Sequence, residues 1–209
     1  SETFSGATQN DARAYPSLVA AALSAERSNV SFSGKGVLRN YDDRDPEVFA
    51  QLYPRALPED AGSTWPFGSW VPDLVFIALG ANDFDVADGR PAPSATAFKA
   101  KYHELVALIR EKNPAAQILC TVNASLNDVY PVGYQALTRM RTILQAVVAE
   151  RNAPPHADPK VHYYELPRAD GSGPGSTPDL TGCDSHSNAA FHARAAPEVA
   201  AKIRAVMGW

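Results

Sequence analysis

A continuous apolar run at residues 74–79, Leu-Val-Phe-Ile-Ala-Leu, constrains the fold of this chain more than any other feature. Such a run is typical of a central strand in a parallel sheet that is covered on both faces. Short apolar runs of this kind alternate along the chain with amphipathic stretches of helical length. Strands separated by helices favour right-handed crossovers and a parallel sheet, so the sequence predicts an α/β fold.

The predicted elements follow this alternation from end to end. Strands are expected at residues 29–33, 71–79, 117–122 and 161–166. Helices are expected at residues 11–26, 46–53, 94–112, 133–151 and 187–206, with Ser94 as an N-cap and a reset of the last helix at Pro197. Residues 170–178 are rich in Gly and Pro and predict a loop. We expect one domain over residues 1–209.

Composition argues against several classes of partner and ligand. The formal net charge is −4 and Lys and Arg do not cluster, which argues against nucleic acid or a membrane surface as the main partner. No apolar run approaches the roughly 18 residues of a transmembrane helix. The cysteines lack the spacing of a zinc site, and we expect neither a metal nor a cofactor.

Residues 80–83, Gly-Ala-Asn-Asp, directly follow the clearest predicted strand. The carboxyl ends of parallel strands are where ligands bind. Gly80 would let the backbone approach a substrate, and the Asn82 amide could donate to a developing oxyanion. Gly34 ends the predicted strand at residues 29–33, and its N–H is a second candidate donor. A plain turn is the alternative at these positions, because Gly, Asn and Asp all favour turns.

Asp184 and His186 lie just before the last predicted helix, with one residue between them. A histidine near a carboxylate fits a general base that takes a proton from a serine. The alternative is a solvated loop histidine at the start of a helix.

Taken together, these motifs resemble the SGNH hydrolase superfamily in order and position. That family has a Gly-containing block after the second strand, Gly-x-Asn-Asp after the third, and an Asp and His pair before the last helix. More narrowly, the chain resembles the carbohydrate esterases of family 2, which remove acetyl groups from plant polysaccharides. The narrower resemblance covers nearly the whole chain and rests on residues 32–36, 39–41, 52–53, 57–58, 65–70, 79–84, 182–186 and 208–209.

The resemblance implies a three-layer α/β/α fold with a flavodoxin-like parallel sheet and a cofactor-free ester hydrolase. Its substrate would be an acetylated carbohydrate or a small ester. The Gly34 N–H and the Asn82 side chain would form the oxyanion hole. His186 would be the general base, with Asp184 its candidate orienting acid, although some family-2 esterases use a backbone carbonyl instead.

The resemblance also bears on sugar recognition. The family often has a Trp at the position of Ser185, so the aromatic platform for the sugar is lost here or supplied from elsewhere. Trp65 and Trp70 are candidate substrate-binding residues, and core packing is the alternative role for both.

By the same resemblance, a nucleophilic serine belongs in a Gly-Asp-Ser block after the first strand, and these 209 residues contain no such block. Residues 4–8 correspond to a stretch shortly after it, so the first strand is expected to be absent too. In the order 2-1-3-4-5 that strand is interior. Its loss leaves backbone groups unpaired at about 1–3 kcal/mol each, against a total stability of about 5–15 kcal/mol. We therefore expect the larger part of a cleaved protein, completed by an N-terminal fragment that carries the strand and the serine.

Cys120 and Cys183 are the only cysteines in the sequence. Two unrelated thiols and one disulfide are both open. In the resembling fold Cys120 ends the fourth strand at the edge where residues 184–186 must also lie, which favours the disulfide. A disulfide implies an oxidising compartment, so we expect a secreted or periplasmic protein.

Two further functions stay open besides ester hydrolysis. One is a catalytically silent carbohydrate-binding module that keeps the fold without a nucleophile. The other is a sugar O-acyltransferase that uses the same residues with a sugar hydroxyl as acceptor.

Overall fold

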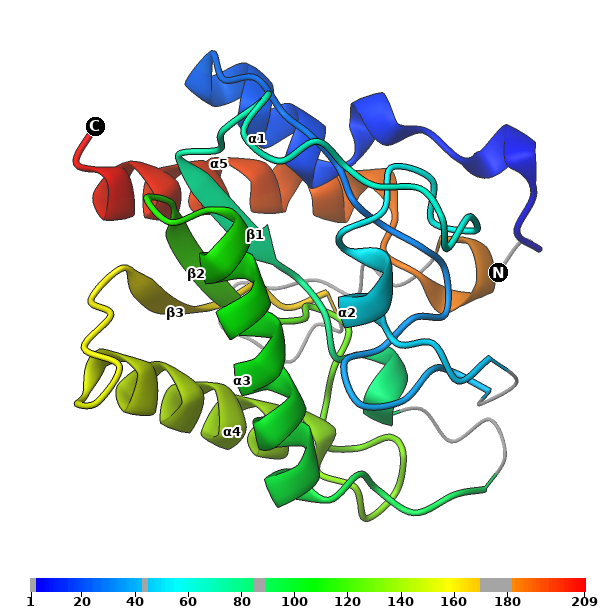
Figure 1. The fold of residues 1–209 in the computed structure, drawn as a ribbon. Coiled ribbons are helices and arrows are strands. Elements are labelled where there is room, and N and C mark those ends of the chain that lie inside the picture. The colour runs from blue at the N-terminus through cyan, green and yellow to red at the C-terminus, as the bar shows by residue number, and fades with distance from the viewer. Residues whose placement is uncertain (1–2, 43–44, 85–88, 170–181) are drawn as a thin grey trace. The chain divides into compact units, whose positions relative to one another are not determined.

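The structure is a computed structural model that describes all residues except 1–2, 43–44, 85–88 and 170–181. It divides into two compact units, whose elements are labelled in Figure 1. The sheet unit comprises Val30–Asn123 and Asn127–Glu165. The helical unit comprises Ser1–Asn29, Ala124–Leu126 and Leu166–Trp209.

The sheet unit contains three parallel strands in the order β1-β2-β3. They are β1 (Leu74–Ile77), β2 (Gln117–Val122) and β3 (Val161–Glu165). Ile77 pairs with Cys120, and Cys120 pairs with Tyr163, so the carboxyl ends of the strands lie at one edge of the sheet. The parallel α/β prediction is confirmed for these strands, which match the predictions for residues 71–79, 117–122 and 161–166 within a few residues.

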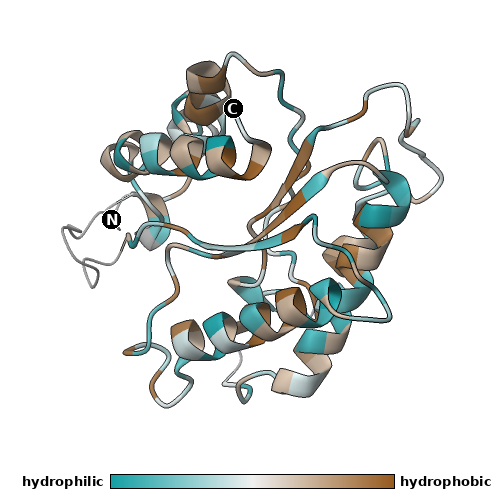
Figure 2. Cartoon of the chain, turned by 90° about the vertical axis from the view of Figure 1, so that its left-hand side faces the viewer, coloured by the Kyte–Doolittle hydropathy of each residue, from teal (hydrophilic) through white to brown (hydrophobic). Residues whose placement is uncertain are grey.

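Two long helices lie against one face of this sheet (Figure 2). They are α3 (Ala95–Lys112) and α4 (Ala136–Asn152), and the short α2 (Phe49–Leu52) precedes β1 in the chain. The Ser94 side chain accepts a hydrogen bond from the Ala97 N–H at 3.4 Å, which confirms the predicted N-cap of α3. The inward stripe of α3 is fully buried and forms the core with the strands; its members at 0% exposure are Phe98, Tyr102, Leu105 and Val106.

The helical unit is held together by α1 (Tyr15–Leu23) packing against α5 (Ala189–Met207). The helix predicted for residues 11–26 is thus shorter, with a separate 3-10 turn at Asp11–Arg13. The predicted reset at Pro197 is wrong, because α5 runs through that residue. Pro197 cannot bond the carbonyl of Ala193, but both residues are exposed, so water can satisfy that carbonyl.

The predicted strand at residues 29–33 does not form. Val30 and Phe32 are 43% and 37% exposed, and no ladder of the described strands includes them. A strand needs a neighbour to pair its backbone groups, and the described sheet ends at β1 on that side. The full five-strand order therefore stays a prediction, and the predicted loop at residues 170–178 lies outside the described residues.

No helix formed by the described residues is both long and apolar enough to cross a bilayer. Their His, Cys, Asp and Glu side chains form no group of three that could hold a metal ion.

Candidate active site

The chain turns sharply where β1 ends, and Gly80 makes that turn possible. Gly80 has φ +114°, a conformation that side chains rarely adopt. A Cβ there would lie 2.5 Å from Met140 Cε and 3.2 Å from Phe98 Cζ, so the backbone touches the side chains of α4 and α3 directly. The turn leads into a 3-10 helix, η3 (Asn82–Phe84), at the carboxyl end of β1.

Asn82 and Gly34, the two predicted oxyanion donors, are neighbours in the sheet unit. The Asn82 Nδ2 donates to the Lys35 carbonyl at 2.8 Å, directly beside Gly34. An amide has two N–H groups, so this bond leaves one for another acceptor. The N–H of Gly34 donates to no other described residue. Both donors are thus available at the carboxyl edge of the sheet, while their catalytic role stays a prediction.

The loop at residues 34–40 is held from several sides. Gly34 has φ +77°, and its carbonyl accepts from the Tyr41 N–H at 2.8 Å. The Gly36 N–H donates to Asn40 Oδ1 at 3.1 Å, and the Gly36 carbonyl accepts from the Phe49 N–H at 2.9 Å. The loop is therefore bonded at both of its glycines.

Asp83 anchors the same loop from within the protein. Its carboxylate is 0% exposed and accepts the backbone N–H groups of Val37 at 2.9 Å, Leu38 at 2.6 Å and Arg39 at 3.0 Å. Burial raises the pKa of the Asp83 carboxyl above its usual value, and the three N–H donors oppose that rise. We did not single out Asp83 from the sequence, because its partners lie more than forty positions away.

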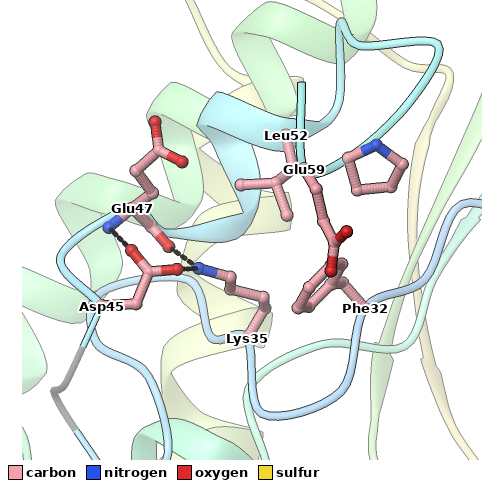
Figure 3. A pocket seen from close by; sticks show the side chains of 7 residues that line it. Phe32, Lys35, Asp45, Glu47, Leu52 and Glu59 are labelled. Carbon is pink, nitrogen blue, oxygen red and sulfur yellow. Dashed lines mark hydrogen bonds and ion pairs between the residues drawn. The ribbon is translucent and has the colours of Figure 1, made fainter. Parts of the chain in front are cut away.

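Lys35 ties the loop to a small cavity, which Figure 3 shows. Its ammonium group bonds the Asp45 carboxylate and the Glu47 carbonyl, although the Lys35 residue is only 5% exposed. The hydrogen bond from Lys35 lowers the pKa of Asp45. The cavity measures about 270 Å³ and is lined by Phe32, Lys35, Asp45, Glu47, Leu52, Pro58 and Glu59.

His186 lies in the helical unit, on the C-terminal side of a short 3-10 turn, η4 (Cys183–Ser185). Its Nδ1 bonds the Cys183 carbonyl at 3.0 Å. A carbonyl can only accept, so Nδ1 carries a proton in this bond, and in the neutral imidazole Nε2 is then the lone-pair nitrogen. Nε2 has no partner among the described residues, and His186 is exposed.

Asp184 forms a hydrogen bond with the N-terminal segment, and its role toward His186 stays a prediction. It has φ +47°, and its Oδ2 accepts from the Phe4 N–H at 3.2 Å. Among the described residues, no hydrogen bond joins Asp184 to His186. The contact on Nδ1 is the backbone-carbonyl alternative, and Asp184 instead holds Phe4 beside the loop that carries His186.

The predicted substrate aromatics belong to the sheet unit. Trp65 and Trp70 are both half-buried, and the Trp65 N–H donates to the Pro54 carbonyl at 2.9 Å. Their role in binding stays a prediction. Tyr41 is an aromatic candidate that we missed: it is 45% exposed, and its Cβ lies 3.8 Å from where a Cβ on Gly34 would be. The sequence does point to Tyr41, because it belongs to the motif at residues 39–41 that supports the resemblance to the family-2 esterases.

Both cysteines are free thiols in the structure. Cys120 is fully buried on β2, and burial raises the pKa of its thiol to about 12. Cys183 is half-buried in the helical unit. The disulfide between them stays a prediction.

An amide at a strand end and an imidazole with its Nε2 free are groups that acyl hydrolases with a serine nucleophile use. Residues 2–194 match the model of the GDSL-like lipase/acylhydrolase family. The chain therefore belongs to this family, which confirms the resemblance in the sequence.

The relatives of the chain are esterases and deacetylases. It is 30% identical over 208 residues to the cellulase/esterase CelE of Acetivibrio thermocellus, covering all of this chain and 23% of that protein. It is 24% identical over 202 residues to an acetylxylan esterase / glucomannan deacetylase of Cellvibrio japonicus, covering 96% of this chain and 50% of that protein. The chain thus spans 23% and 50% of the length of these two curated relatives.

The chain is also similar to solved structures of carbohydrate esterases. A family two carbohydrate esterase from Clostridium thermocellum, in complex with cellohexaose, is 29% identical with a TM-score of 0.84, covering 100% of this chain and 58% of that one. A carbohydrate esterase family 2 enzyme with a carbohydrate binding domain, from Corynascus thermopiles, is 30% identical with a TM-score of 0.84 and covers 100% and 62%.

Proposed function

We propose that the chain is the catalytic part of a serine-type ester hydrolase that removes acetyl groups from carbohydrate. The observation that carries the proposal is the bond from His186 Nδ1 to the Cys183 carbonyl at 3.0 Å. It fixes the tautomer whose Nε2 can accept a proton, which is the state a general base needs. Gly34 and Asn82 supply the second requirement, two N–H donors at the carboxyl edge of a parallel sheet.

In the proposed reaction a serine Oγ attacks the acetyl carbonyl carbon while His186 Nε2 takes the hydroxyl proton. The carbonyl oxygen becomes an oxyanion that accepts from the Gly34 N–H and from Asn82 Nδ2. His186 then gives its proton to the sugar oxygen as the C–O bond breaks, leaving an acetyl-serine. A water molecule repeats the sequence and releases acetate. Loss of one oxyanion donor costs about 10²–10³ in kcat in enzymes of this kind.

The serine in this proposal lies in a part of the protein other than these 209 residues, which contain no Gly-Asp-Ser block. An N-terminal fragment that also adds a strand to the sheet remains our proposed source. The contact of Asp184 with the Phe4 N–H supports it, because it keeps the N-terminal segment beside the loop of His186. Intact-mass measurement of the denatured, active protein tests the idea. A single folded and active polypeptide of only these residues would contradict it.

An acetylated polysaccharide is the proposed substrate because relatives act on xylan and glucomannan esters or were solved with cellohexaose. Tyr41 supports the proposal, because it is 45% exposed, its Cβ lies close to Gly34, and a sugar can stack on an exposed aromatic ring. A secreted or periplasmic location fits a polymeric substrate and stays part of the proposal.

The test is hydrolysis of p-nitrophenyl acetate and release of acetate from acetylated xylan by the complete protein. His186→Ala is expected to lower kcat by about 10³-fold or more, because the serine loses its base. His156→Ala is the matched control, since His156 is exposed in the sheet unit and stacks on His103. Equal activity of wild type and His186→Ala would refute the assigned base.

A further inference from the structure

We propose that Asp83 is a positioning residue for the oxyanion hole: its buried carboxylate shapes the loop that presents the Gly34 N–H opposite Asn82. The inference rests on the proposed function, because it assigns a cause to the geometry of the two donors. It is built entirely from contacts within the sheet unit.

The carboxylate acts as a template for the backbone. Three consecutive N–H groups, those of Val37, Leu38 and Arg39, converge on its two oxygens at 2.6–3.0 Å. N–H groups of neighbouring residues point the same way only when the chain curls around their acceptor. The curl is tight, because a Cβ on Gly36 would lie 1.9 Å from the Arg39 carbonyl oxygen and 2.6 Å from Asp83 Oδ2.

Two adjacent residues, Asn82 and Asp83, each form hydrogen bonds with the loop. Asn82 holds the Lys35 carbonyl at 2.8 Å, and Asp83 holds residues 37–39. Arg39 returns the contact, since its Nε donates to the Asp83 carbonyl at 2.8 Å. A shift of the carboxylate therefore displaces residues 37–39 and, through them, Gly34 relative to Asn82. Asp83 is 0% exposed, so it acts through the loop.

An amide in place of the carboxylate breaks this arrangement with little change of shape. Asp83→Asn keeps one acceptor oxygen and turns the other into an NH₂ donor that faces backbone N–H groups. We expect a fall in kcat of about tenfold or more with KM changed less than about threefold, because oxyanion contacts act in the transition state. A merely structural role lowers the folded fraction, which reduces the apparent kcat at unchanged KM, so kcat is expressed per folded molecule with the folded fraction measured by tryptophan fluorescence. On that basis a merely structural role leaves kcat unchanged, whereas the positioning role lowers it.

The decisive comparison is a double-mutant cycle in the complete protein. If Asp83 acts through the oxyanion donors, Asp83→Asn in the Asn82→Ala background lowers kcat by clearly less than it does in the wild type. Equal factors in both backgrounds overturn the inference. Asp158→Asn is the matched control: Asp158 is half-buried in the same unit, bonds Arg110 at 2.8 Å and 3.0 Å, and precedes β3 at the opposite edge of the sheet. We expect it to lower stability without changing kcat.

Two measurements separate the possible failures. An inactive wild type, or an Asn82→Ala variant at full activity, refutes the proposed function; an active wild type with Asp83→Asn at full kcat refutes this inference alone. If Asp83→Asn does not fold, amide hydrogen exchange of the folded wild type decides. Slow exchange at Val37, Leu38 and Arg39 supports the template, and exchange as fast as in an open loop overturns it.

Discussion

Gly80→Ala is the substitution whose cost the structure defines most closely. Gly80 combines a positive φ of +114° with a backbone that touches Met140 and Phe98. Alanine adds only one methyl group, so both effects are tested without a change in polarity or charge. The position also lies two residues before Asn82, at the edge of the candidate site.

The expected magnitude is the sum of two terms. A non-glycine residue held in this backbone region costs about 1–3 kcal/mol. The new Cβ also meets Met140 Cε at 2.5 Å and Phe98 Cζ at 3.2 Å. Methionine can rotate away, so we expect the lower part of the range of about 1–3 kcal/mol for overpacking. The free energy of unfolding should therefore fall by about 2–5 kcal/mol.

Gly68→Ala separates the two terms. Gly68 has φ +97°, and beyond its two chain neighbours no heavy atom of the described residues lies within 4 Å of the position its Cβ would take. This variant carries the backbone strain alone, so it should lose about 1–3 kcal/mol. The difference between the two variants measures the contact with Met140 and Phe98.

Urea unfolding of the complete protein, followed by tryptophan fluorescence, measures both variants against the wild type. A change in the midpoint with an unchanged slope reports stability. The reasoning is refuted if Gly80→Ala loses no more than Gly68→Ala, because the close approach to α3 and α4 would then carry no cost. It is also refuted if neither variant differs from the wild type.

Two further predictions follow from buried or capping groups. Burial raises the pKa of the Cys120 thiol to about 12. Above about pH 8.5 the thiol ionises in the unfolded protein but stays protonated in the folded one. The free energy of unfolding should therefore fall by about 1.4 kcal/mol per pH unit because of this group. In urea unfolding between about pH 8 and 10.5, Cys120→Ala should show a shallower decline than the wild type. Equal declines would contradict the buried thiol, and a thiol titration after unfolding that finds no free group would establish the disulfide instead. Ser94→Ala removes the 3.4 Å cap of α3 and should cost about 0.5–1 kcal/mol by urea midpoint, whereas no change would show that the long bond is ineffective.

Local sequence signals predicted the elements whose partners lie nearby. The strand at residues 117–122 is predicted to the residue, because a short run that is mostly apolar and rich in β-branched side chains is typical of a buried strand. The start of α3 was predicted from Ser94 for a similar reason, since an N-cap bonds an N–H only three residues on. The Gly80 turn, too, follows from its own backbone and its place after an apolar run.

Features that depend on distant partners could not be predicted in the same way. The segment at residues 29–33 alternates apolar and polar side chains, but a strand also needs a neighbour, and sequence does not show where one lies. Asp184 looked like a partner for His186 because the two are close in the chain. Its left-handed backbone turns it toward Phe4 instead, a contact between residues 180 positions apart. The Cys183 carbonyl that meets His186 has no side-chain signature at all.

The hydrogen bonds between Asp83 and the loop at residues 34–40 determine which substitutions the loop can accept. The carboxylate accepts hydrogen bonds from main-chain N–H groups, which every residue except proline has. Leu38 is half-buried, so many side chains can replace it while the backbone conformation of the loop is kept. Proline is the substitution the position cannot accept. The course of the loop thus depends on Asp83, on Gly36 and on the side chains of Asn40 and Arg39, and only weakly on the side chain at position 38.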